Sequence, residues 1–166
     1  VVEVEQACRE GLARNAGTPQ ARMWLAAARD LTTTPEGIAW LHAVWGGRER
    51  TAAGALIESD QIAVAEALAV LDSEHGEAVV HEQLTRTVSP ERRARLEYLL
   101  PALSASPSSR EAMLTRLRYP EVRRPEAWAL VALAHMHHPL RQDHAVALIR
   151  PSLELLPEVH RTGDIF

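Results

Sequence analysis

Four places in this chain put a hydroxyl residue directly before a proline, and they constrain the fold more than any other feature. They are Thr18-Pro19, Thr34-Pro35, Ser89-Pro90 and Ser106-Pro107. Proline suits the first position of a helix, because its missing N–H would have no partner there. The hydroxyl before it can accept a hydrogen bond from the first turn. The first two prolines are sixteen residues apart and the last two seventeen, so each interval has room for one helix of about 10–14 residues and a short turn.

Apolar residues between these signals recur with the period of a helix. The clearest stripe consists of Leu96, Leu99, Leu100 and Leu103, and Pro101 is expected to kink or end that helix. Ser59 or Asp60 is the expected cap of another helix. The other stripes lie within residues 4–12, 23–31, 38–45, 64–71, 79–84 and 113–117. No run of alternating apolar and polar residues indicates a strand.

These patterns predict an all-α protein. Antiparallel helix pairs at this cadence indicate a two-layer α-α superhelix, a HEAT- or armadillo-like solenoid of about nine or ten short helices. A rounded helical array is the alternative. The length fits one domain, and no linker divides residues 1–166, so we expect a single helical domain.

One helix is expected to lie inside this stack. The segment 125–136 has Ala, Trp, Leu, Val or Met at almost every position. A helix that is apolar all round is usually covered on more than one side, and this one is too short to span a bilayer, which takes about 20 residues. Pro139 is expected to stop it.

Charge and composition exclude several classes of protein. The net charge is -4 with both signs interspersed, which argues against a nucleic-acid partner, whose binding surface is usually basic. No signal peptide or membrane span is evident. We therefore expect a cytoplasmic protein, with a signal or anchor on a longer parent left open. The single cysteine, Cys8, lies on an apolar stripe and is expected to be a buried, inert thiol.

The C-terminal part of the chain resembles a known family. Four blocks carry the resemblance: Arg-Pro-Glu-Ala-Trp at 124–128, His-His-Pro-Leu-Arg at 137–141, Leu-Glu-Leu-Leu at 153–156 and Arg-Thr-Gly-Asp-Ile-Phe at 161–166. Leu31-Thr32-Thr33 with Gly37, and Glu58 with Asp60, match more diffusely. In order and spacing, the blocks are similar to the C-terminal helical domain of bacterial zinc aminopeptidases, the membrane-alanyl-aminopeptidase family of gluzincin metallopeptidases.

The resemblance implies a non-catalytic domain that covers an active-site cavity and limits peptide access. Its partners would be the N-terminal catalytic domain of the same polypeptide and the peptide substrate, from which the parent removes N-terminal residues. The family binds zinc with a His-Glu-x-x-His helix and a downstream Glu. His81-Glu82 begins that motif, but no second histidine follows.

We therefore assign no catalytic, cofactor-binding or metal residue within 1–166, and expect zinc in a catalytic domain upstream. The chain opens with Val1 rather than Met and closes on Ile165-Phe166, which favours a C-terminal fragment of a larger protein. Such a fragment is expected to be inactive alone and to self-associate through exposed apolar surface.

Other residues support alternative hypotheses. His135, His137, His138 and His144 could form an independent metal site in a self-contained enzyme, but a zinc site needs further ligands and orienting partners, and imidazoles also suit a helix C-terminus. Basic clusters occur at Arg92, Arg93, Arg95, Arg123 and Arg124. An arginine could bind a peptide carboxylate, or these clusters could form a solvated face. Trp24, Trp40, Trp45 and Trp128 could fill gaps between helices or anchor an interface of a free-standing HEAT-like scaffold.

Overall fold

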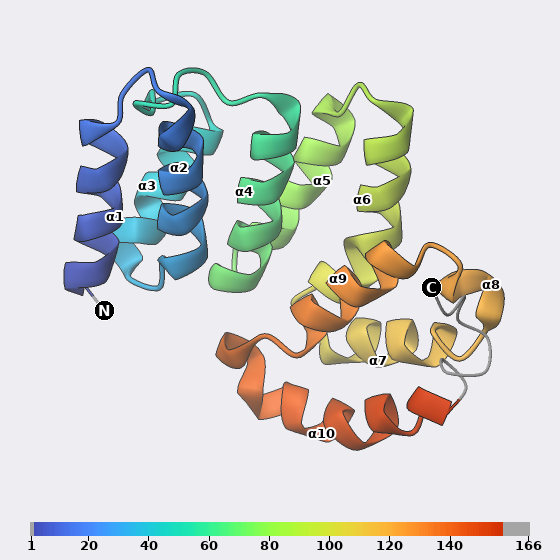
Figure 1. The fold of residues 1–166 in the computed structure, drawn as a ribbon. Coiled ribbons are helices and arrows are strands. Elements are labelled where there is room, and N and C mark those ends of the chain that lie inside the picture. The colour runs from blue at the N-terminus through green and yellow to red at the C-terminus, as the bar shows by residue number, and fades with distance from the viewer. Residues whose placement is uncertain (1, 158–166) are drawn as a thin grey trace. The chain divides into compact units, whose positions relative to one another are not determined.

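The computed structural model describes residues 2–157, which form ten α-helices and one short 3-10 helix, with no β-strand in that range (Figure 1). The all-α prediction and the expected number of helices are confirmed. Contacts divide the chain into unit 1, Val1–Thr87, and unit 2, Val88–Phe166. The expectation of a single domain stays a prediction, and the block at 161–166 lies outside the described residues.

Unit 1 contains five helices. They are α1 (Val2–Arg14), α2 (Pro19–Leu31), α3 (Pro35–Trp45), α4 (Glu58–Leu71) and α5 (Gly76–Arg86). The helices of two consecutive pairs, α1 with α2 and α4 with α5, lie side by side, and α4 also contacts α3 and α2. Leu12, Ala21 and Leu25 form one buried cluster, against which Trp24 and Trp40 pack. The packing of consecutive helices fits the predicted two-layer arrangement.

Two glycines allow these pairs to approach closely. A Cβ atom on Gly11 would lie 2.5 Å from the Trp24 ring, and one on Gly76 would lie 2.2 Å from the backbone oxygen of Leu68. Real Cβ atoms do not occupy such positions, because van der Waals repulsion rises steeply at these distances. Gly11 therefore sets the distance between α1 and α2, and Gly76 sets the distance between α4 and α5.

Unit 2 contains the remaining helices. They are α6 (Pro90–Leu103), α7 (Pro107–Arg116), α8 (Pro120–Arg123), α9 (Glu126–Met136), η1 (Pro139–Arg141) and α10 (Gln142–Leu153). Helix α6 contacts both α7 and α9, and α10 packs on α7 (Figure 1). The fully buried side chains Leu96, Leu99, Leu103, Met113 and Met136 form its interior.

Each hydroxyl–proline pair begins a helix, as predicted. Pro19, Pro35, Pro90 and Pro107 are the first residues of α2, α3, α6 and α7. Only two of the hydroxyls cap their helices: Thr34 accepts from the Gly37 N–H and Ser89 from the Arg92 N–H. Thr18 instead donates to the Asn15 carbonyl oxygen, and the Ser106 hydroxyl bonds that of Ser108. The prolines thus locate the helices even where the hydroxyl bonds elsewhere.

Three local expectations need correction. Helix α4 begins at Glu58 with Ile57 as its cap, so Ser59 and Asp60 lie inside its first turn. Helix α6 does not end at Pro101 but continues to Leu103, because proline there falls in the last turn and removes only one helical hydrogen bond; the alternative, a kink at Pro101, stays a prediction. Helix α9 stops before Pro139 as predicted, but the expectation that it is covered on more than one side needs correction.

The burial of α9 follows one face. Ala129, Ala132 and Met136 are buried, whereas Leu130 is 61% exposed. Ala127 and Ala134 are exposed as well. The uniformly apolar sequence of α9 therefore does not predict which of its sides are covered by other helices of unit 2.

Candidate functional site

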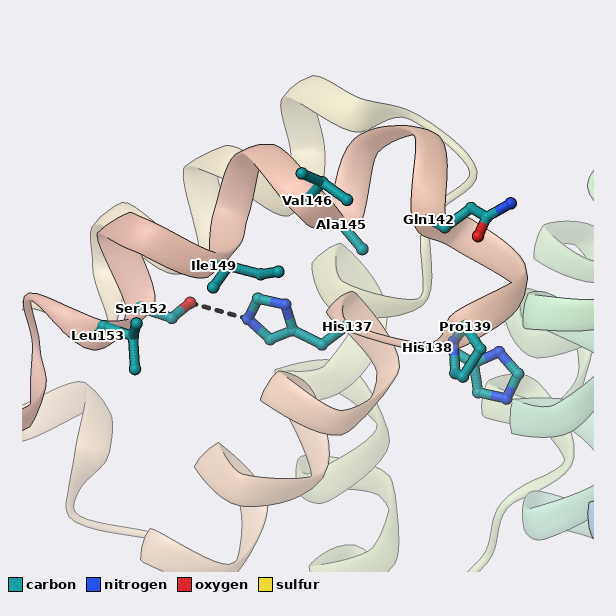
Figure 2. Close-up of a pocket in the computed structure, with 9 residues that line it drawn as sticks. All are labelled: His137, His138, Pro139, Gln142, Ala145, Val146, Ile149, Ser152 and Leu153. Carbon is teal, nitrogen blue, oxygen red and sulfur yellow. Dashed lines mark hydrogen bonds between the residues drawn. The ribbon is translucent and has the colours of Figure 1, made fainter.

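Unit 2 contains an apolar groove that could bind a ligand or another protein. Its volume is about 430 Å³, and nine residues line it (Figure 2). They are His137, His138, Pro139, Gln142, Ala145, Val146, Ile149, Ser152 and Leu153. None of these is an aspartate, glutamate or arginine. The groove thus offers apolar contact with a few neutral polar groups, the usual character of a binding site.

The turn from α9 into α10 shapes the groove. Pro139 cannot continue α9, so the chain leaves that helix after Met136 and makes the single turn η1. The Arg141 guanidinium then holds the turn in place. It donates to the carbonyl oxygens of Ala102 at 2.8 Å and Leu103 at 2.7 Å, and to that of His135 at 3.4 Å. One side chain thereby joins the C-terminal ends of α6 and α9.

His137 connects α9 with α10 across the groove. Its Nε2 lies 2.8 Å from the Ser152 hydroxyl oxygen (Figure 2). Both side chains are half-buried. This pair resembles the first two members of a hydrolytic triad, in which a histidine takes the proton of a serine. A triad also needs a group that orients the histidine and donors for the oxyanion, and the groove lining contains no carboxylate. The pair therefore reads as a structural tie between helices.

His138 caps the short helix η1. Its Nδ1 accepts from the Leu140 N–H at 3.3 Å. Burial lowers the pKa of His138, and the positive charge of Arg141 and the neighbouring His135 lower it further. All three effects favour the neutral ring that this hydrogen bond requires. The direction of the pKa shift thus agrees with the role of His138 Nδ1 as a hydrogen-bond acceptor.

The structure does not bring the four candidate histidines together as metal ligands. His137 bonds Ser152, His138 bonds the backbone of η1, and His144 is exposed on α10. Among residues 2–157, no group of three or more His, Cys, Asp or Glu side chains has an arrangement suited to a metal ion.

Unit 1 contains a histidine–carboxylate cluster that the sequence did not predict. His42 lies 2.8 Å and His75 3.4 Å from the same Asp72 carboxylate oxygen, while the other oxygen accepts from the N–H groups of Glu74 and His75. Burial raises the pKa of Asp72, but these hydrogen bonds outweigh it and the pKa is lowered. Asp72 thus joins His42 of α3 to His75, which precedes α5.

Glu5 is the second polar group that the sequence reasoning missed. It is 2% exposed, and its carboxylate accepts four hydrogen bonds. The donors are the N–H and hydroxyl groups of Thr33, at 2.7 and 3.2 Å, and of Thr34, at 2.9 and 2.6 Å. These bonds tie α1 to the α2–α3 turn. The only available signal was an acidic residue on an otherwise apolar stripe.

The other candidates have structural contacts. Arg123 donates to the carbonyl oxygens of Leu117 and Arg118, at the end of α7. Trp45 bonds Gln83 at 2.8 Å and lies under Arg86, and Trp128 packs edge-on against Tyr98. These contacts favour the gap-filling interpretation of the tryptophans. Cys8 is buried, as predicted.

Comparisons with known proteins add no relative. No family model, curated protein or solved structure matches the chain. Within the described part, no helix is both long enough and apolar enough to cross a bilayer.

Proposed function

We propose that this chain is a non-catalytic helical domain of a zinc aminopeptidase similar to the membrane-alanyl-aminopeptidase family. One observation supports the proposal: within the described residues, two of the resemblance blocks contact other helices of unit 2, and a third adjoins such a contact. Trp128 of the first block packs on Tyr98 of α6, and Arg141 of the second bonds the end of α6. His137 of the second block bonds Ser152, next to the third block.

The proposed role is steric. A wall of packed helices excludes bulk protein and water from an adjoining cavity and restricts entry to peptides, which helps to position the reacting groups. The groove fits this role because its lining is uncharged, so it can meet apolar side chains without burying a charge. The zinc ligands and the general base would come from the catalytic domain.

The coding sequence upstream of Val1 provides the first test. We expect it to encode a His-Glu-x-x-His helix. The full enzyme should then cleave short peptides well and folded proteins poorly, and deletion of residues 1–166 should reduce that selectivity in kcat/KM. The isolated 166-residue chain, supplied with zinc, should not hydrolyse an aminoacyl substrate. Turnover by the isolated chain would overturn the proposal.

A free-standing interaction scaffold is the second candidate, and the apolar groove of about 430 Å³ is the observation that favours it. The two functions make opposite predictions about the gene. A start codon shortly before Val1, with no peptidase sequence upstream, would support the scaffold.

A further inference from the structure

Helix α10 has two apolar faces, and within the described residues one of them is buried and the other is exposed. Ala145 and Leu148 are buried on the inner face, where α10 packs on α7. On the outer face Val146 is 67% exposed, Ile149 48% and Leu153 57%. Contiguous exposed apolar patches are uncommon on monomeric proteins and are often contact surfaces.

The outer face has the spacing of a coiled-coil seam. We call Gln142, Val146, Ile149 and Leu153 the α10 seam; the steps between them are four, three and four residues. That alternation places residues at the a and d positions of a heptad repeat, which face a partner helix. All four line the groove (Figure 2), so the groove follows the seam and can receive side chains from a second helix.

The seam is complementary to itself in one orientation. If a second α10 runs antiparallel, Val146 lies opposite Ile149 of the second copy, and Gln142 lies opposite Leu153. Each pairing occurs twice around a twofold axis. Every seam residue therefore lies opposite a seam residue of the other copy, as an isologous interface requires. None of them is charged, and the contact buries no unpaired charge.

The charges beside the seam select the same orientation. Asp143 and Arg150 are exposed and seven residues apart, so they occupy the same flanking position in consecutive heptads. In an antiparallel pair this position faces its own equivalent, which brings Asp143 opposite Arg150 of the second copy, twice. In a parallel pair the facing positions would be Ala145 and Ser152, which offer no opposite charge. Arg150 also bonds Glu154 of its own helix at 3.3 Å, and its further donors can serve Asp143.

We propose that α10 is a homodimerisation surface, on which a second copy of this chain packs its own α10 in antiparallel orientation through the seam. The inference does not rest on the proposed function. A helix of twelve residues is about 18 Å long, and a contact between two such helices falls in the small class of interfaces, below about 1,200 Å². The dimer should therefore be weak and concentration-dependent.

Sedimentation equilibrium of the 166-residue chain between roughly 10 µM and 1 mM tests the surface, because weak interfaces dissociate in that range. We expect a monomer–dimer equilibrium. Ile149→Glu should leave only monomer, since it places a charge in the seam. The matched control is Leu130→Glu, on the exposed side of α9, which should dimerise like the wild type. Both variants should show the wild-type helical circular dichroism spectrum.

A charge swap tests the orientation. Asp143→Arg or Arg150→Asp alone should weaken the dimer about tenfold, because two attractive pairs become repulsive. The double variant Asp143→Arg with Arg150→Asp should restore it. A wild-type chain that is monomeric throughout would overturn the proposal. So would a dimer that survives Ile149→Glu, one lost equally in Leu130→Glu, or single reversals that the double variant does not rescue.

Discussion

Glu5 shows how one buried carboxylate can organise a turn. Burial raises the pKa of Glu5, but hydrogen bonds from the Thr34 hydroxyl, the N–H groups of Thr33 and Thr34 and the Thr33 hydroxyl outweigh it, and the pKa falls below 4.5. Thr33 lies in the Leu31-Thr32-Thr33 block, which contributes to the family resemblance. In the structure Thr33 has a structural role, because it donates hydrogen bonds to the Glu5 carboxylate.

Replacing Glu5 should destabilise the protein in a pH-dependent manner. Glu5→Gln weakens charge-assisted hydrogen bonds and should cost about 1.5–3 kcal/mol in the free energy of unfolding near neutral pH. Because the folded-state pKa is lowered, this contribution is fully present above pH 4.5 and is lost as the pH falls through the folded-state pKa. Urea denaturation at a series of pH values measures it.

The exposed Glu3, on the same helix, supplies the control for that experiment. Glu3→Gln should change the unfolding free energy by less than about 0.5 kcal/mol, as exposed substitutions usually do. If Glu5→Gln costs no more than Glu3→Gln, or its cost does not shrink in acid, the assigned role is wrong.

At the scale of elements, arginines join the helix ends of unit 2. Arg141 donates hydrogen bonds to carbonyl oxygens of α6 and α9. Arg123 donates to carbonyl oxygens at the end of α7. Arg110 donates to the carbonyl oxygens of Ser104 and Ala105, which follow α6. The last carbonyl groups of a helix lack partners within it and carry partial negative charge. A guanidinium with five donors can satisfy several of them at once.

Arg141→Met should therefore loosen the corner between α6, α9 and α10. We expect a loss of about 1.5–3 kcal/mol, the usual contribution of hydrogen bonds to a charged group. Arg150→Met, which within one copy of the chain removes an exposed pair with Glu154, should cost the monomer a few tenths of a kcal/mol. Thermal and urea denaturation measure the loss of unfolding free energy in each variant. Equal losses would contradict the role of Arg141 in joining α6, α9 and α10.

Close helix approach gives a second prediction at this scale. Gly76→Ala places a Cβ against the Leu68 carbonyl oxygen, and backbone cannot move aside as a flexible side chain can. We expect a loss of about 1–3 kcal/mol, although alanine is the better helix former. His81→Ala, at an exposed position of α5, should be close to neutral. A stabilised Gly76→Ala variant in chemical denaturation would show that α4 and α5 are not held at this distance.

At the scale of the whole chain, the two units should respond separately to substitution. Glu5 and its partners lie in unit 1, and Arg141 and its partners lie in unit 2. Effects at sites without shared partners usually add within about 0.5 kcal/mol. The double variant Glu5→Gln with Arg141→Met should therefore lose the sum of the single losses in urea denaturation. An interaction energy well above that limit would show that the two sites are energetically coupled.

Much of the fold could be predicted from the sequence, but little of the candidate site. The all-α class, the helix starts at Pro35 and Pro90 and the end of α9 before Pro139 follow from local rules. The groove does not, because it depends on how α9, η1 and α10 meet. The same holds for the Asp72 cluster, whose partner His42 lies thirty residues away, since no local pattern reports a contact across such a separation.

The sequence by itself determined where α2, α3, α6 and α7 begin, because proline acts on the backbone torsion and hydrogen bonding of its own position. Tertiary structure alone decided which face of each helix is covered and which partner each polar atom takes. Helix α9 is apolar all round yet buried along one face, and α10 keeps a second apolar face exposed. Burial and hydrogen bonding between helices depend on residues distant in the chain, which is why these features emerge only when the helices are packed.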